Sequence, residues 1–210
     1  MKEIQKVIKV YDFNELSEEA REKVCQQVGD SITDNGVWWC EDILNLFVER
    51  CKDYGMNVYG EDIHFDGFWS QGGGASFVCD NIDMKKLLHT VGIQVSDELF
   101  VKVLDYIYEV NIVRTSYQAA HAQTIHAGVF VDEDALEEEE DEGIIQYIHD
   151  IADTLEFKLE KLKDALCQQL YNDLEQQYEY LHSTVYVEEL AHDNEMLFLA
   201  DGTIYDWGEY

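Results

Sequence analysis

The stretch from Gly143 to His182 most constrains the fold, because it carries a long run of apolar residues at helical spacing. Isoleucine and leucine recur mostly every three or four residues along it, at Ile144, Ile148, Ile151, Leu155, Leu159, Leu162, Leu166, Leu170, Leu174 and Leu181. At 1.5 Å per residue, one helix of about 40 residues would be roughly 60 Å long. The sequence therefore predicts a helix that either packs along most of the domain or pairs with a second copy in a homodimer.

A glycine-rich hairpin is predicted at Ile63–Phe77, which reads I-H-F-D-G-F-W-S-Q-G-G-G-A-S-F. Its first residues alternate as a strand does, and the stretch that begins at Ala75 is apolar enough to return as a neighbouring strand. The three consecutive glycines can adopt positive φ, or allow another backbone or a ligand to come close. We expect core packing of Phe65, Trp69 and Phe77.

The loop of this hairpin is also a candidate contact site, formed by Trp69, Ser70, Gln71, Gly72, Gly73 and Gly74. A phosphate-binding P-loop needs a lysine after its glycines, and none follows here. A nucleophile elbow needs G-x-S-x-G, and the segment around Ser70 is one residue too long for that motif. The loop is therefore predicted to be a structural turn, with contact to a small ligand or a partner as the alternative. No catalytic residue is predicted.

The remaining patterns predict an α+β fold, in which an antiparallel sheet around the glycine-rich hairpin packs against several helices. Helices are expected from the Ser17 cap to about Thr33, over 37–54 and 84–91, and after Ser96, with Leu99, Phe100, Val103, Leu104 and Ile107 buried. Strands are expected at 4–10 and within 110–131, where a helix is the alternative. Asp201-Gly202 predicts a type I′ hairpin. The expected organisation is a core over 1–131, an acidic loop over 132–142, and the long helix and C-terminal hairpin of 143–210 on the same core.

The charge is extreme, since 14 Lys+Arg against 45 Asp+Glu give a net charge of −31. Such a surface repels DNA, RNA and anionic membranes and favours a partner protein with a basic surface. The densest acidic run lies between the predicted strands and the long helix and is expected to be an exposed loop or helix lead-in. Its carboxylates are the predicted partner-binding residues: Asp132, Glu133, Asp134, Glu137, Glu138, Glu139, Glu140, Asp141 and Glu142.

Metal, cofactor and disulfide signals are weak. The acidic run lacks the D-x-[D/N]-x-[D/N]-G order of a calcium loop, and His121 and His126 are spaced five apart, so neither a metal nor a cofactor is predicted. The five cysteines contain no C-x-x-C pair, which favours reduced thiols. No signal peptide or membrane span is recognised, so a cytoplasmic protein is expected.

Three segments carry a resemblance to a known family. They are Y-D-F-N-E-L-S-E-E-A-R-E-K near the start, F-D-G-F-W-S-Q-G-G-G-A-S-F in the middle, and D-L-E-Q-Q-Y-E-Y-L with N-E-M-L-F-L-A-D-G near the end. With these segments the chain resembles a widespread family of small acidic bacteriophage proteins, some of which are labelled antitoxins of toxin–antitoxin stability systems. In that family the loop often reads S-Q-G-D-G-A-S, so Gly73 stands here in place of an acidic residue. The resemblance implies a phage origin, but it does not indicate an activity or a catalytic residue.

Three functions remain open. The first is an acidic interaction protein that inhibits a host defence or nucleic-acid-handling protein in the host cytoplasm, with DNA mimicry as one mechanism. The second is an antitoxin-like neutraliser of a basic toxin, although no basic helix–turn–helix is present. The third is a small enzyme or ligand-binding protein that uses the glycine-rich loop, for which His64 and Ser70 are the residues to test.

Overall fold

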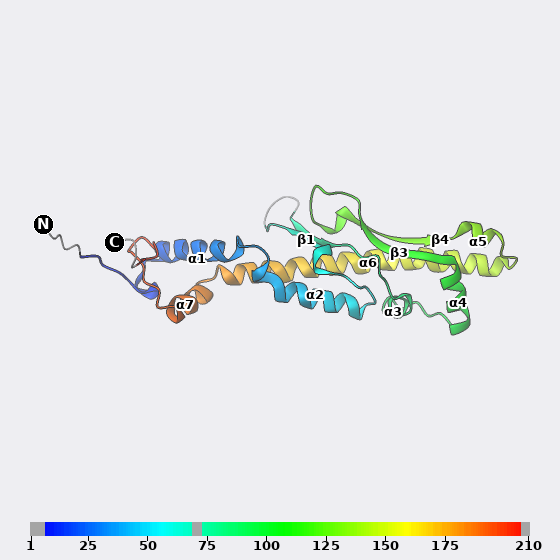
Figure 1. The fold of residues 1–210 in the computed structure, drawn as a ribbon, viewed down its shortest axis with the longest axis horizontal. Helices are drawn as coiled ribbons and strands as arrows, with labels where there is room; N and C mark the ends of the chain where they lie inside the picture. Colours follow the sequence, from blue (N-terminus) through cyan, green and yellow to red (C-terminus); the bar gives the residue numbers. More distant parts are fainter. Residues whose placement is uncertain (1–6, 69–72, 207–210) are drawn as a thin grey trace. The chain divides into compact units, whose positions relative to one another are not determined.

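A computed structural model describes residues 7–68 and 73–206, and it confirms the α+β class with 58% helix and two small antiparallel sheets (Figure 1). The chain divides into two compact units. One comprises Met1–Glu41 together with Leu174–Tyr210, and the other comprises Asp42–Asp173. The expected packing of residues 143–210 on a core formed by residues 1–131 stays a prediction.

The first unit is built from α1 (Glu18–Thr33), α7 (Thr184–Asp193) and the short helices η1 (Phe13–Glu15) and η2 (Trp38–Cys40). The predicted cap of α1 is confirmed, because the Ser17 hydroxyl accepts a hydrogen bond from the Ala20 N–H at 3.2 Å. Ser183 caps α7 in the same way. Apolar side chains of these elements form one core, made of Phe13, Leu16, Ala20, Val24, Cys25, Val28, Val187, Ala191 and Phe198.

Near the two termini of the chain, the structure of this unit differs from what the sequence predicts. Residues 4–6 of the expected opening strand lie outside the described residues, and 7–10 form no strand, although Tyr11 makes an isolated bridge to Phe198. The chain does reverse at Asp201-Gly202, where the Leu199 N–H donates to the Thr203 carbonyl at 2.8 Å. The type I′ assignment is wrong, because that turn needs positive φ at both central residues and only Gly202 has it, at +82°.

The second unit holds the strands. Its elements, in order, are α2 (Glu41–Asp53), η3 (Gly60–Asp62), β1 (Ile63–Asp66), β2 (Gly74–Phe77), α3 (Met84–Thr90), α4 (Asp97–Tyr106), β3 (Ile107–Arg114), η4 (Ala122–Thr124), β4 (Ile125–Val131), α5 (Glu133–Glu137) and α6 (Glu142–Leu181), with the first residue of α2 and the last turns of α6 assigned to the first unit. The long helix and the strand assignment within 110–131 are both confirmed.

The strands form two antiparallel pairs. In the pair β1–β2, Phe65 lies opposite Ala75, and in the pair β3–β4, Ile112 lies opposite Ala127. A bridge joins the pairs: the Cys79 N–H donates to the Ile112 carbonyl at 3.0 Å, and the Ile112 N–H donates back at 2.7 Å. The glycine-rich hairpin is therefore linked to the second pair through the residues that follow β2.

The apolar stripe of α6 forms the core of this unit. Ile148, Leu155, Leu159 and Leu170 are fully buried, as are the rings of Phe47 and Phe77, which meet edge to face with centroids 5.3 Å apart. The prediction that the stripe packs in a core is confirmed, and pairing with a second copy stays a prediction. Of the predicted core trio, Phe77 is buried, Phe65 is half-buried, and Trp69 lies outside the described residues.

The predicted buried face of α4 and of the residue after it is partly confirmed, and Ile107 is buried as expected. Ser96 caps the helix as expected, and Val103 is fully buried. Leu104 is 47% exposed, whereas Leu99 and Phe100 are only half-buried. Within the ten residues of α4 only Val103 is buried, so a narrow strip of the helix surface reaches the core.

Candidate functional site

The acidic segment Asp132–Glu142 folds as a capped connection rather than as an open loop. The Asp132 carboxylate accepts a hydrogen bond from the Ala135 N–H at 3.0 Å and so caps α5. The Asp141 carboxylate accepts from the Gly143 N–H at 2.9 Å, at the start of α6. Both of these predicted partner-binding residues therefore hold the backbone of the segment in place.

Glu139 is the third carboxylate of the segment with a structural role. It accepts a hydrogen bond from the Lys102 ammonium at 2.8 Å and another from the Tyr106 hydroxyl at 2.7 Å. These hydrogen bonds, first that of Lys102 and then that of Tyr106, lower the pKa of Glu139 to about 2. Glu139 thus ties the acidic segment to α4.

Replacing Glu139 with Gln is expected to destabilise the protein at neutral pH and to have little effect in strong acid. The pKa of Glu139 in the folded chain lies below its ordinary value of 4.5, so its stabilising contribution is complete above pH 4.5 and disappears as the pH falls through about 2. Melting temperatures measured between pH 7 and pH 2 would show this convergence. Glu140→Gln is the matched control, because Glu140 is exposed and shows no hydrogen bond or ion pair. A constant difference at all pH values would contradict the assignment.

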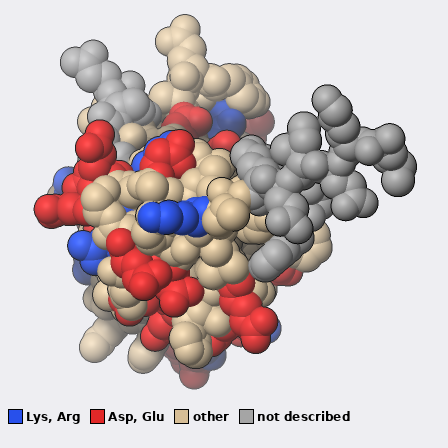
Figure 2. Space-filling model, turned by 90° about the vertical axis from the view of Figure 1, so that its left-hand side faces the viewer, with Lys and Arg blue, Asp and Glu red and all other residues tan. Residues whose placement is uncertain are grey.

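The other six carboxylates of the segment are exposed, as predicted: Glu133, Asp134, Glu137, Glu138, Glu140 and Glu142. The one ion pair among them that the structure shows is between Glu133 and His149, at 3.8 Å. Acidic side chains are also spread widely over the face drawn in Figure 2, with fewer basic ones between them. The six carboxylates are thus available to a partner, and their role in binding stays a prediction.

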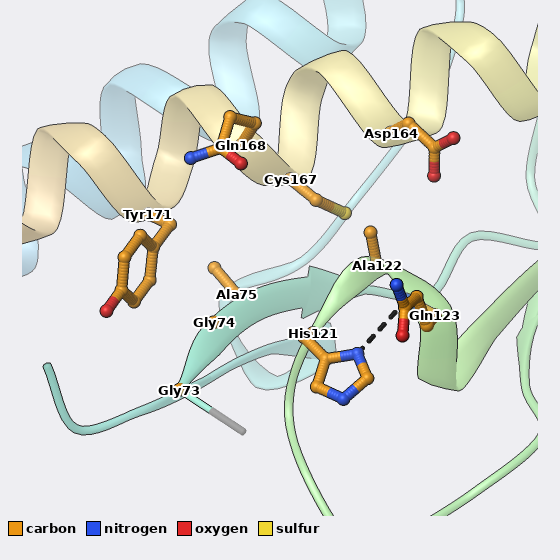
Figure 3. A pocket seen from close by; sticks show the side chains of 10 residues that line it. All are labelled: Gly73, Gly74, Ala75, His121, Ala122, Gln123, Asp164, Cys167, Gln168 and Tyr171. Carbon is orange, nitrogen blue, oxygen red and sulfur yellow. Dashed lines mark hydrogen bonds between the residues drawn. The ribbon is translucent and has the colours of Figure 1, made fainter. Parts of the chain in front are cut away.

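A pocket of about 400 Å³ lies beside the glycine-rich loop (Figure 3). Trp69, Ser70, Gln71 and Gly72 lie outside the described residues, so the structure does not test their predicted contacts. Gly73 and Gly74 do line the pocket. The remaining lining residues are Ala75, His121, Ala122, Gln123, Asp164, Cys167, Gln168 and Tyr171.

One wall of the pocket is formed by a single face of α6. Asp164, Cys167, Gln168 and Tyr171 are related by three, four and seven residues, so they share one face of the helix. The opposite wall is made by the start of β2 and the segment around η4, where the His121 Nδ1 accepts a hydrogen bond from the Gln123 N–H at 3.2 Å.

Gly74 lets these two segments of the opposite wall come close. A Cβ at this position would lie 2.4 Å from the His121 Cβ and 3.1 Å from the Ala120 carbonyl oxygen. The sequence offers two reasons for the glycines, positive φ and the close approach of another segment. The φ of Gly74 is not positive, so the close approach is the reason for glycine at this position.

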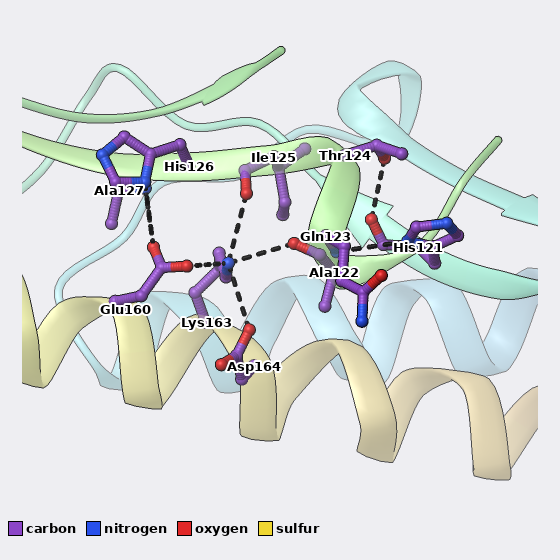
Figure 4. A network of polar contacts seen from close by, with 10 residues as sticks. All are labelled: His121, Ala122, Gln123, Thr124, Ile125, His126, Ala127, Glu160, Lys163 and Asp164. Carbon is purple, nitrogen blue, oxygen red and sulfur yellow. Dashed lines mark hydrogen bonds and ion pairs between the residues drawn. The ribbon is translucent and has the colours of Figure 1, made fainter. Parts of the chain in front are cut away.

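A buried lysine borders the pocket (Figure 4). The Lys163 side chain is 1% exposed, and its ammonium donates to the carbonyls of Ala122 at 3.0 Å and Ile125 at 3.2 Å. It also pairs with Glu160 at 2.5 Å and Asp164 at 3.1 Å. Every donor hydrogen of the ammonium therefore has a partner, which is the condition for burying a charge.

The same helix covers the outer edge of β4. Glu160 accepts a hydrogen bond from the Ala127 N–H at 3.0 Å, and Glu156 accepts from the Val129 N–H at 3.4 Å. Four residues of helix rise by about 6 Å, which matches the roughly 6.6 Å between alternate residues of a strand. Carboxylates one turn apart on α6 thus satisfy alternate N–H groups of the strand edge. Burial raises the pKa of Glu160, but the hydrogen bonds from Lys163 and Ala127 outweigh it, so the pKa is lowered overall.

The sequence analysis missed this network, although a signal was present. Lys163 lies four residues after Leu159 and three before Leu166, so it occupies a position on the apolar stripe itself. A cation at such a position has to be buried with its counter-charges. Glu160, three residues before Lys163, and Asp164, the residue after it, are the acidic residues close enough to pair with its ammonium.

The histidines and cysteines occupy separate environments. His121 lines the pocket, His126 lies 3.5 Å from Glu160, and burial lowers the pKa of the half-buried His64. Among the described residues, no group of three or more His, Cys, Asp or Glu is placed to hold a metal ion. All five cysteines are free and buried. Burial raises the pKa of Cys167 to about 12, which keeps the thiol in the pocket protonated at neutral pH.

Comparison with known proteins gives a family and no activity. Within the part of the chain that the structure describes, no helix is long and apolar enough to cross a membrane. No curated protein and no solved structure matches the chain. The family model described as "Domain of unknown function (DUF8835)" matches residues 39–184, which include the pocket, the acidic segment and the buried lysine. Because the match covers more than half of the 210 residues, the chain belongs to the DUF8835 family.

Proposed function

We propose that this protein is an acidic interaction protein that binds a basic protein surface of the kind that ordinarily contacts nucleic acid. The observation that carries the proposal is the charge, −31 from 45 acidic and 14 basic residues, on a chain that nonetheless forms apolar cores. A carboxylate-covered surface attracts Lys- and Arg-lined clefts over several ångströms and speeds encounter with them.

The acidic segment is the part of this surface that we propose as the contact. Its backbone is fixed by the caps of Asp132 and Asp141 and by the tie of Glu139 to α4. The six exposed carboxylates therefore project from an ordered framework, so less conformational entropy of the acidic segment would be lost on binding than if it were a disordered tail.

The proposed setting follows the resemblance to phage proteins. In that setting the partner is a host defence or nucleic-acid-handling protein in the host cytoplasm, and binding would inhibit it by occupying the place of DNA phosphates. An antitoxin acting on a basic toxin would use the same electrostatics. We propose no catalytic step: Cys167 and His121 both line the pocket, but the raised pKa of Cys167 disfavours a thiolate nucleophile.

Neutralising the acidic segment is expected to weaken partner binding by about tenfold or more, because each lost charge lowers the attraction. The six exposed carboxylates are changed together to Gln or Asn, and tagged wild type and variant are compared in capture from a bacterial host lysate at about 0.1 M and 0.5 M salt. The matched control neutralises six exposed acids elsewhere in the second unit: Asp42, Glu61, Asp80, Glu98, Asp105 and Asp153.

A captured protein then provides the decisive measurement, which is competition with a labelled DNA duplex. The proposal expects a partner that is released at high salt, is lost with the acidic-segment variant, is retained by the control, and is displaced from DNA by the wild type. Equal loss with both variants would contradict a role specific to the segment. A partner held through high salt would contradict the electrostatic mechanism.

A further inference from the structure

The pocket beside the glycine-rich loop is elongated along α6. Asp164 and Tyr171 are seven residues apart, which corresponds to about 10 Å of helix rise, and Figure 3 shows them at opposite ends of the lining, with Cys167 and Gln168 between them. The facing wall has no side chain at Gly73 and Gly74, and the rest of it is lined by Ala75, His121, Ala122 and Gln123. This form fits a long, narrow group rather than a compact one.

The charge at one end of the pocket is negative and fixed. Two carboxylates, Glu160 and Asp164, face one ammonium, Lys163, so these three groups carry a net charge of −1. Lys163 is 1% exposed and held by two backbone carbonyls, and therefore cannot swing out to follow a ligand. Asp164 is 46% exposed and contacts Lys163 through Oδ1, which leaves its other oxygen for a ligand.

These features select the chemistry of the occupant. Phosphate and carboxylate ligands would be repelled by Asp164 and by the overall charge. A planar guanidinium suits the carboxylate and can donate further hydrogen bonds to amide oxygens such as those of Gln123 and Gln168. At the other end, the ring of Tyr171, which packs against Phe68 with centroids 5.5 Å apart, offers an apolar surface to a methylene stem.

We infer that this pocket receives an arginine side chain of the partner, with the guanidinium at Asp164 and the stem along Gln168 and Tyr171. The inference rests on the proposed function, and it adds a specific anchor to a surface that otherwise attracts basic partners by charge alone. A lysine ammonium is a compact, strongly hydrated point charge and gains less from the same groups. The pocket therefore distinguishes arginine from lysine, whereas the exposed carboxylates do not.

The test compares arginine with lysine at equal charge. Two probes of each kind are titrated into the full chain at low salt: N-acetylarginine amide and N-acetyllysine amide, followed by an arginine-rich and a lysine-rich peptide of the same length. Binding is measured by calorimetry, and the site is located by amide NMR shifts. The expected result is arginine-specific shifts at Gly74 and Gln168, and a preference of about fivefold to tenfold for the arginine peptide.

Variants separate the pocket from the general charge. Asp164→Asn and Tyr171→Leu should each remove the arginine preference, and Tyr171→Leu leaves the contacts of Lys163 intact, which guards against a folding defect. Asp153→Asn, an exposed acid on the same helix, should keep the preference. Equal binding of the two peptides, or shifts only outside the pocket, would overturn the inference while leaving the proposed function standing. Pocket shifts with the arginine amide but no binding of either peptide would support the pocket and count against the proposed function.

Discussion

Replacing Lys163 with Met is expected to lower the free energy of unfolding by about 3 kcal/mol, the low end of the range for breaking a buried ion pair by removing one partner. The substitution leaves the carbonyls of Ala122 and Ile125 without their donor and places Glu160 and Asp164 beside an apolar side chain. The loss falls at the low end because Glu160 is 33% exposed and Asp164 46%, so water can reach both carboxylates.

Urea unfolding at pH 7 would measure this loss. Lys161→Met is the matched control: Lys161 is exposed on the same helix, with its ammonium 5.7 Å from the Phe157 ring centroid, and its replacement should change stability by no more than about 0.5 kcal/mol. A second change, Glu160→Gln in the Lys163→Met background, should recover part of the loss, because it removes a half-buried carboxylate that has lost its ammonium partner. Equal effects of Lys163→Met and Lys161→Met would show that the network does not stabilise the fold.

Replacing Gly74 with Ala should cost a similar amount, about 3 kcal/mol, because it overpacks a site bounded by backbone. The added Cβ would lie 2.4 Å from the His121 Cβ and 3.0 Å from the His121 Cα, so a side-chain rotation cannot relieve the clash. Either β2 or the segment before η4 has to move, and the wall of the pocket moves with it. The same variant should therefore also lose the arginine preference of the pocket.

Gly67→Ala is the control for this variant. It lies just after β1 in the same motif, and a Cβ there would meet nothing within 4 Å, so a change within about 0.5 kcal/mol is expected. His121→Gly combined with Gly74→Ala should recover part of the stability, because it removes the closest contact. If Gly74→Ala and Gly67→Ala unfold alike in urea, the close approach at Gly74 is not what requires glycine.

Local signals in the sequence were sufficient for most elements. Ser17, Ser96 and the apolar stripe of α6 predicted helices that the structure confirms, because capping and helical spacing depend on residues close together in the chain. The choice of strands for 110–131 was also right, since the alternation before Asp132 reflects one face that is buried. The acidic run was correctly placed between the strands and the long helix.

The sequence by itself determined the α+β class, the long helix, the hairpin around the glycines and the excess of negative charge. Only the tertiary structure decided which side chains meet across large separations in the chain. It joined Lys163 to the carbonyls of 122 and 125, Glu139 to α4, and Gly74 to His121, and it exposed Leu104 on a helix that was expected to bury it. The physical reason is that caps and periodicity are set within a few residues, whereas burial of a charge or a close backbone approach depends on where another segment packs.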